Sequence, residues 1–503
     1  METATVQRGV PGRVGTLGRI RGVSADRLAI WALVALIVLA FVGFFVRVTY
    51  PNYDSYYALL WGRELLDFHL PSFEAYRAPT EHPLAVGFGA LLSLFGDGAD
   101  RLLVLCTILS LVALAAGTYR LGRLCFTPTI GAIAAFLVLT RFDFHSLAIR
   151  GYIDVPYMAT VVWAGALEAA RPRRGLPVFL LLIAAGLMRP EAWLLLGVYF
   201  LWICWGASWR DRVRYAALTA IAPLAWVTTD FIVTGDPFFS LNSTQDLAAE
   251  LHRQKSGSVL LDVLPEFLRD TVKTPVYFAG IAGIAIAFWR FPLRFAIPAV
   301  LFLTGVFTFV ATGVAGLSVI VRYLMVPSVM MCLFAAVAVA GFTMLPPGSR
   351  VRRAWATAAA IGVVAGLAYT AVHPPSPSRF DDELGFRGEE GKSLRSLLNS
   401  APVQDGLARC GPLSVPTHKL IPDARWVLDR DEGGVVARSD PSPSAKRKAR
   451  YGVAVFPVGR RNILRTGFAV STKTITQVPA PGFRRIATER YFAAYLRCPP
   501  GRA

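Results

Sequence analysis

Charged side chains gather at the ends of several apolar segments of the chain. Asp54 follows the first apolar run, Arg150 and Asp154 lie in RGYIDVPYM, Arg189 ends one apolar run and Arg322 begins another. Ionisable groups at membrane depth are costly, so each is a candidate functional residue. Arginine binds phosphate oxygens bidentately, and a nearby carboxylate can accept a proton. The set predicts a site that holds a phosphate carried on a membrane lipid and takes a proton from a second molecule.

Arg189 and Arg322 are the preferred phosphate ligands, because each is expected at the depth of the lipid headgroups. Arg150 is a third candidate. The alternative for any of them is anchoring at the interface, with the long side chain reaching toward water.

The elements that position these residues are predicted to be membrane-spanning helices. The composition is 54% hydrophobic and 17% charged, which disfavours a water-soluble globule. A bilayer core needs about 20 apolar residues per helix. Eleven segments fit this requirement approximately: 28–47, 100–119, 126–142, 152–170, 175–189, 191–207, 214–233, 275–290, 294–314, 321–345 and 353–372.

Arginine-rich turns predict how these helices are oriented. Basic clusters precede the first span and then occur at every second turn, as in YRLGR, RPRRG, SWRDRVR, WRFPLR and GSRVRR. The positive-inside rule makes those turns and the N-terminus cytoplasmic, and the odd number of spans sends the C-terminal tail outside. The same loops account for much of the net charge of +19, so no nucleic-acid partner is needed.

The chain therefore divides into a basic cytoplasmic leader, 1–27, a membrane domain, 28–373, and an extracytoplasmic tail, 374–503. Two outward loops of the membrane domain, 48–99 and 234–274, are long enough to hold a site. Within the first loop, YDSYYALLWGRELLDF predicts an amphipathic helix at the interface, and AVGFGALLSLFG predicts a re-entrant segment or half-helix.

The tail is predicted to be a small α/β domain. The runs PLSVP, YGVAVFPV and TKTITQV favour strands, whereas GKSLRSLLNSA and ERYFAAYLR favour helices. Cys410 and Cys498 enclose most of the tail and are predicted to form a disulfide in an oxidising compartment. The fold class is thus an all-α polytopic membrane protein with a C-terminal α/β domain.

Six motifs in order resemble one known family. The first span, YDSYYALLWGRELL, EHPLAVGFGALLSLFG, RGYIDVPYM, LMRPEAWLLL, TGDPFFS and VRYLMVPSVM are similar to bacterial GT-C glycosyltransferases of the dolichyl-phosphate-mannose and lipid-sugar-modifying type. The resemblance covers residues 28–345, and the tail resembles an appendage of actinobacterial members. It implies an inverting hexosyl- or pentosyltransferase that moves a sugar from a polyprenyl phosphate to a cell-envelope glycan, lipid or protein.

The resemblance also implies roles for particular residues. Asp54 matches the acid that acts as base or orients the acceptor, Asp154 matches a second acid, and Arg189 and Arg322 match the phosphate-holding arginines. Aromatic rings suit the apolar faces of sugars, although an interfacial aromatic belt is the alternative. The remaining candidates for the sugar or acceptor are Tyr57, Glu81, His82, Tyr152 and Glu191.

One departure from the family concerns metal ions. Many relatives carry paired acids in the first loop, whereas Ser55 follows Asp54 here. Divalent cations gather several oxygen ligands, so a mechanism without a metal is favoured. Asp143 and His145 remain possible metal ligands.

Two other classes of protein remain open. A transporter or flippase of lipid-linked glycans would also need many spans and phosphate-binding arginines, but it needs polar groups in the middle of the membrane, and here they are one-sided. A catalytically inactive envelope scaffold would function without Asp54.

Overall fold

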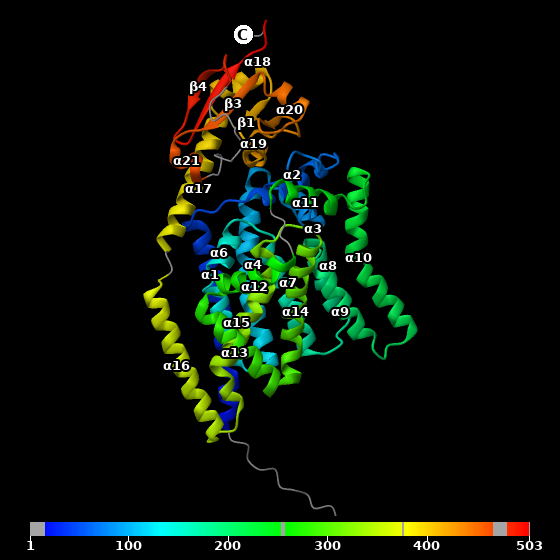
Figure 1. Ribbon diagram of the computed structural model, residues 1–503, viewed down its shortest axis with the longest axis vertical. Helices are drawn as coiled ribbons and strands as arrows, with labels where there is room; N and C mark the ends of the chain where they lie inside the picture. The colour runs from blue at the N-terminus through cyan, green and yellow to red at the C-terminus, as the bar shows by residue number, and fades with distance from the viewer. Residues whose placement is uncertain (1–15, 253–256, 375–376, 466–479, 502–503) are drawn as a thin grey trace, which may run out of the picture.

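The helices form one body, and a small sheet lies at one end of it (Figure 1). The computed structural model describes residues 16–252, 257–374, 377–465 and 480–501. Each of the eleven predicted spans coincides with a helix. These helices are α1 (Thr16–Val46), α4 (Ala99–Cys125), α5 (Pro128–Leu139), α7 (Asp154–Ala170), α8 (Leu176–Met188), α9 (Ala192–Cys204), α10 (Trp209–Thr234), α13 (Thr274–Arg290), α14 (Pro292–Val314), α15 (Met325–Ala340) and α16 (Arg350–Val372).

Length and apolarity select fewer of these helices as membrane crossings. Within the described residues six qualify, namely α1, α4, α10, α14, α16 and α15 with the 3₁₀ turns η2 (Val321–Leu324) and η3 (Gly341–Met344). The number rises to eight if two bent pairs each count once. These pairs are α5 with α6 (Phe142–Ile149), bent by 61°, and α12 (Gly257–Val272) with α13, bent by 113°.

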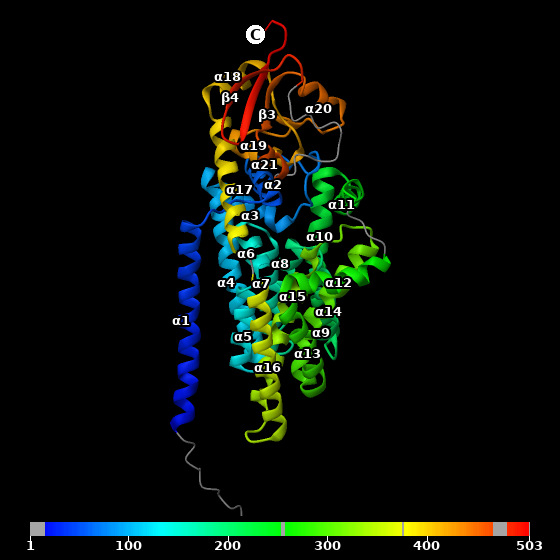
Figure 2. The ribbon, with the colours of Figure 1, turned by 60° about the vertical axis from the view of Figure 1, so that its left-hand side comes forward.

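The helices differ sharply in how much of their surface the protein covers. The apolar part of α15 is 89% buried, whereas that of α1 is 6% buried and that of α16 is 0% buried. Figure 2 shows α1 standing at the edge of the body. Exposed apolar faces of this length fit lipid contact, while α15 is the centre of the protein core.

The first long loop folds into α2 (Tyr53–Leu66) and α3 (Pro83–Ser93). Asn52 begins α2, because its side chain accepts hydrogen bonds from the Asp54 and Ser55 amides. The predicted helix is present, and its position at the membrane interface stays a prediction. Residues on every face of α2 are buried, from Ser55 to Glu64, because α3, α4 and the tail all pack against it.

Two glycines let α2 and α3 cross in backbone contact. A Cβ atom on Gly62 would lie 2.2 Å from the Ala90 amide nitrogen, and one on Gly89 would lie 2.2 Å from the Ala58 carbonyl oxygen. No side chain fits at either point. The crossing holds α2 close to the helical body.

The tail contains a five-stranded sheet in the order β2-β1-β3-β5-β4. Strand β1 runs parallel to β2 and β3, whereas β5 is antiparallel to β3 and β4. The strands are β1 (Leu413–Val415), β2 (Val435–Ala437), β3 (Gly452–Pro457), β4 (Arg484–Thr488) and β5 (Phe492–Arg497). The helices beside them are α17 (Pro377–Leu398), α18 (Ala401–Cys410), α19 (Ile421–Leu428), α20 (Pro443–Lys448) and α21 (Arg460–Arg465).

One predicted element of the tail is wrong. ERYFAAYLR was expected to be helical, but Phe492–Arg497 is β5. Its six residues pair with β3 on one side and β4 on the other, and this long-range pairing overrides the local preference of an alanine-containing run. TKTITQV lies outside the described residues. A disulfide joins Cys410, at the end of α18, to Cys498, directly after β5.

The glycine crossing gives a test of the fold. Gly89→Ala should lower the thermal midpoint, since overpacking a close contact costs about 1–3 kcal/mol. Gly87 is the control, because a Cβ atom there has nothing within 4 Å, and alanine is a better helix former than glycine. A thermal scan of the detergent-purified variants measures both. An equal midpoint for the two variants would contradict the crossing.

Candidate functional site

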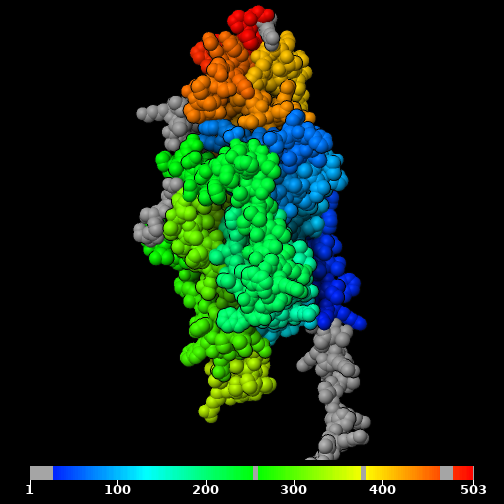
Figure 3. All heavy atoms as spheres, turned by 90° about the vertical axis from the view of Figure 1, so that its right-hand side faces the viewer, coloured from blue at the N-terminus to red at the C-terminus, as the bar shows by residue number. Residues whose placement is uncertain are grey.

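A cavity of about 1310 Å³ lies between the helical body and the tail. Its walls come from the start of α2, the α6–α7 and α8–α9 turns, α10, η2 and the tail. Figure 3 shows the tail, in orange, seated on the blue segment of α2 and α3, with the green upper end of α10 and α11 (Phe239–Glu250) below that segment. The site is therefore built by segments far apart in the sequence.

Five of the predicted residues form a continuous chain of ion pairs at this cavity. Arg322 Nη1 lies 3.1 Å from Asp54 Oδ2 and 3.4 Å from Asp154 Oδ2. Arg189 pairs with the other oxygen of Asp154 and also contacts Glu191 at 2.5 Å. The order is Asp54, Arg322, Asp154, Arg189, Glu191. Sequence analysis named all five residues but not their pairing.

The members of the chain differ in access to the cavity. The Asp54 and Arg322 side chains are 32% and 31% exposed, whereas that of Asp154 is 1% exposed and that of Arg189 is 8% exposed. Asp54 and Arg322 therefore meet a ligand first. Asp154 and Arg189 are more deeply buried, and Asp154 contacts Arg322 from the buried side.

Helix ends fix the positions of the two aspartates. Asp54 and Asp154 lie in the first turns of α2 and α7, where the helix dipole stabilises a carboxylate. Ser55, the residue after Asp54, donates a hydrogen bond to the Gly151 carbonyl at 2.6 Å. Gly151 has a φ of 71°, a conformation that favours glycine. This contact joins the start of α2 to the loop that leads into α7.

Arg150 and Tyr152 stand next to this chain in the wall of the cavity. The Tyr152 ring lies 5.1 Å from the Arg150 guanidinium and 5.0 Å from that of Arg322. One buried nitrogen of Arg150, Nε, has no hydrogen-bond partner. The guanidinium groups of Arg150 and Arg322 thus lie against the same Tyr152 ring, and the Nε–H of Arg150 can donate a hydrogen bond to an anion.

The predicted sugar contacts fall into two groups. Tyr152, His82 and Glu191 line the cavity. His82 is neutral, since burial lowers its pKa to about 3. Tyr57 and Glu81, in contrast, do not line it in the described structure. Tyr57 is fully buried within its own hydrophobic cluster, so it does not form the expected platform.

Glu81 instead belongs to a buried carboxylate pair. The Ser240 hydroxyl lies 2.8 Å from Glu81 Oε1 and 2.6 Å from Asp230 Oδ2, and it accepts a hydrogen bond from Trp226. Burial, together with the neighbouring Asp230, raises the pKa of Glu81 to about 8. Glu81 therefore keeps its proton at neutral pH. Glu81 lies in the first long outward loop and Asp230 on α10, so only folding brings the two acids together.

Asp143 and His145 lie away from the cavity. The His145 ring contacts the Leu139 carbonyl at 2.6 Å, and neither residue is part of the cavity wall. Among the described residues, no group of three or more His, Cys, Asp or Glu could hold a metal ion. The predicted metal pair is therefore not assembled with other ligands in this part of the chain.

The tail adds residues that sequence analysis did not assign to the site. They include Arg387 and Glu390 of α17, His418 and Lys419 of the turn η4 (His418–Leu420), and Asp423 of α19. Burial raises the pKa of Asp423 to about 7. No local motif marks these residues, since only the docking of the tail brings them to the cavity.

No protein-family model and no curated protein matches the chain. Its architecture is that of the GT-C membrane glycosyltransferases, as the resemblance predicted. ArnT from Cupriavidus metallidurans bound to undecaprenyl phosphate superimposes with a TM-score of 0.55 at 14% identity, over 92% of this chain and 97% of that one. The archaeal oligosaccharyltransferase AglB from Archaeoglobus fulgidus, in complex with an inhibitory peptide and a dolichol-phosphate, gives 0.51 at 12% identity, over 93% and 74%. At such identities the likeness shows the fold, and the reaction must be argued from the site.

The buried pair of Glu81 and Asp230 predicts a pH dependence of stability. The folded state holds the Glu81 proton up to about pH 8, whereas the unfolded chain releases it near its ordinary value of 4.5. Folded protein thus binds more protons in this window, so stability falls as pH rises toward 8. Glu81→Gln should flatten the decline of the thermal midpoint between pH 6 and pH 9. If the thermal midpoint of Glu81→Gln falls with pH as steeply as that of the wild type, the proton held by the Glu81 and Asp230 pair is contradicted.

Proposed function

We propose that the protein is a membrane glycosyltransferase that moves a sugar from a polyprenyl phosphate to an acceptor hydroxyl. The acceptor is a glycan, lipid or protein of the cell envelope, and the reaction takes place on the outer face of the cytoplasmic membrane. The basic turns support this orientation, with the N-terminus inside and the tail outside.

The observation that carries the proposal is the chain of acids and arginines at the mouth of a large cavity. The cavity volume of about 1310 Å³ exceeds the roughly 300–1,000 Å³ of a typical single-ligand pocket, which suits two substrates. Arginines within it can hold a phosphate, and Asp54 is partly exposed beside them. Two of the solved structures that share the fold were determined with undecaprenyl phosphate or dolichol-phosphate.

The reaction is a single displacement with Asp54 as base. Asp54 accepts the proton of the acceptor hydroxyl, and the acceptor oxygen bonds to the anomeric carbon from the face opposite the phosphate. The bond between that carbon and the phosphate oxygen breaks, and its electron pair leaves with the phosphate. The configuration of the sugar is therefore inverted.

Arg322 links donor binding to the base. In the structure it pairs with Asp54, and this contact occupies the carboxylate. A donor phosphate contacting Arg322 would compete for that guanidinium, with Arg150 available beside Tyr152. Arg189 is occupied by Asp154 and Glu191, so we assign it to holding Asp154 in place.

The arginines also supply the charge stabilisation that a metal ion provides in other transferases. Fixed positive groups near the departing phosphate lower the barrier as its charge develops. Asp54 and Asp154 both contact Arg322, whose positive charge lies between the two carboxylates. We therefore propose a reaction that proceeds without a divalent cation.

The test uses purified protein and a panel of polyprenyl-phosphate hexoses and pentoses, with acceptor fractions from the envelope and with chelator present. We expect one donor to be consumed and polyprenyl phosphate to be released. Arg322→Met should lower kcat by about 10²–10³, the usual effect of losing one such charge contact. Arg322→Lys should fall in between, because lysine keeps the charge but not the fork of donors.

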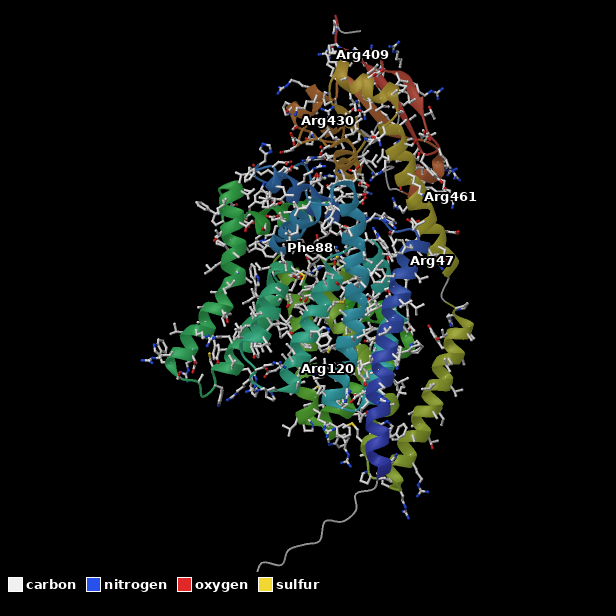
Figure 4. All side chains as sticks on the ribbon, turned by 180° about the vertical axis from the view of Figure 1, so that it is seen from behind. Arg47, Phe88, Arg120, Arg409, Arg430 and Arg461 are labelled. Atoms are coloured by element: carbon white, nitrogen blue, oxygen red, sulfur yellow. A yellow bond between two sulfur atoms is a disulfide. The ribbon has the colours of Figure 1, made fainter. Side chains whose placement is uncertain are left out.

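Arg120 provides the matched control. It lies on α4 away from the cavity, in the lower half of the helical body, where Figure 4 labels it. Arg120→Met should transfer sugar at the wild-type rate. Translocation of a lipid-linked glycan without transfer would indicate a transporter instead, and full activity of Arg322→Met would remove Arg322 from the mechanism.

A further inference from the structure

The helix that carries Asp54 is fastened to the tail by a buried ion pair. Arg425 of α19 is 1% exposed, and its Nη2 lies 2.5 Å from Glu64 Oε1 near the end of α2. Glu64 also accepts hydrogen bonds from the Ser72 amide at 2.7 Å and the Ser72 hydroxyl at 2.9 Å. Arg425 donates to the Arg430 carbonyl at 3.2 Å. Both charges are thus desolvated and fully engaged.

Further contacts surround this pair on the same face of α2. The Arg63 guanidinium lies 5.0 Å from the Trp426 ring and pairs with Asp429 at 2.6 Å. The Trp426 ring packs against Tyr56 with a centroid distance of 6.3 Å. The contact between α2 and α19 therefore runs from the first turn of α2 to its last.

The geometry couples this contact to the candidate base. Glu64 follows Asp54 by ten residues on one continuous helix, a rise of about 15 Å. A helix of this length moves as a rod, so loosening one end changes the direction of the other. Asp54 must keep its place in the cavity wall, where the structure puts it 3.1 Å from Arg322.

We propose that the pair of Glu64 and Arg425 makes the tail a positioning element for Asp54. This inference rests on the proposed function. Glu64 and Arg425 touch neither substrate in this account. They act through α2, and removing either one leaves a buried charge without its partner, which strongly destabilises the local contact.

A second ion pair between tail and helices serves as the control. Arg47, at the end of α1, pairs with Asp381 of α17, and these side chains are 58% and 47% exposed. Figure 4 labels Arg47 at the end of α1 nearest the tail. This pair also joins the two parts but does not touch α2, and exposed pairs contribute little.

The experiment combines hydrogen exchange with kinetics on the full-length protein. In Arg425→Met, α2 amides should exchange faster by about tenfold or more, because the docked helix opens more often. We expect kcat to fall by a similar factor, with the donor KM within about twofold. Glu64→Gln should give the same increase in exchange and the same loss of kcat. It replaces Arg425→Met in the test if that variant does not fold.

The double variant Glu64→Met with Arg425→Met distinguishes the positioning of α2 from the damage that an unpaired buried charge causes. Two apolar side chains can replace a buried ion pair without leaving a charge, so the double variant should regain most of the α2 protection and kcat. Arg47→Gln should change neither quantity. Unchanged α2 exchange in Arg425→Met and Glu64→Gln, or an equal loss in Arg47→Gln, would overturn the proposal.

The two readouts also distinguish this inference from the proposed function. Exchange of α2 does not require turnover. If the wild type transfers no sugar, the proposed function is refuted. If Arg425→Met in that case still exchanges its α2 amides faster, the attachment of α2 to the tail by this ion pair is supported. Normal transfer in every variant, with faster exchange, would refute the positioning role alone.

Discussion

The interaction on which the site depends is the bridge that Arg322 makes between Asp54 and Asp154. Each aspartate begins a different helix, and each therefore sits in the positive field of a helix N-terminus, but two carboxylates at this depth need a cation between them. Arg189 neutralises the buried side of Asp154. The result is an alternating row of three carboxylates and two guanidinium groups whose exposed end, at Asp54 and Arg322, faces the cavity beside Arg150.

The packing around that bridge explains why the tail belongs to the site. Glycines at the crossing with α3 hold one face of α2, the Ser55 contact with Gly151 holds its start, and α19 covers another face. Without the tail, α2 would lose its contacts with Trp426 and Arg425 of α19, and the cavity would lose the wall formed by α17 and α19. The helix α2, which was predicted to be amphipathic, is buried between the helical body and the tail.

Sequence patterns predicted the elements that depend on local composition, and they missed the contacts that form only when distant segments pack together. Apolar runs located the eleven helices, and the residue types of Asp54, Arg189 and Arg322 singled out side chains that line one cavity. No pattern in the chain reports that Glu81 faces Asp230, or that Arg425 reaches Glu64 across more than three hundred residues. The strand at Phe492–Arg497 was missed for the same reason, since its partners on both sides decide its conformation.

The central claim, that Asp54 is the base for sugar transfer, is tested most directly by single-turnover kinetics of Asp54→Asn. Asparagine keeps the size of the side chain and removes its ability to accept a proton, so the account predicts that the rate of the transfer step falls by about 10²–10⁴ while donor binding persists. Folding is checked by the thermal midpoint of the same sample. A transfer step in Asp54→Asn as fast as in the wild type, in a folded protein that binds donor, would contradict the account.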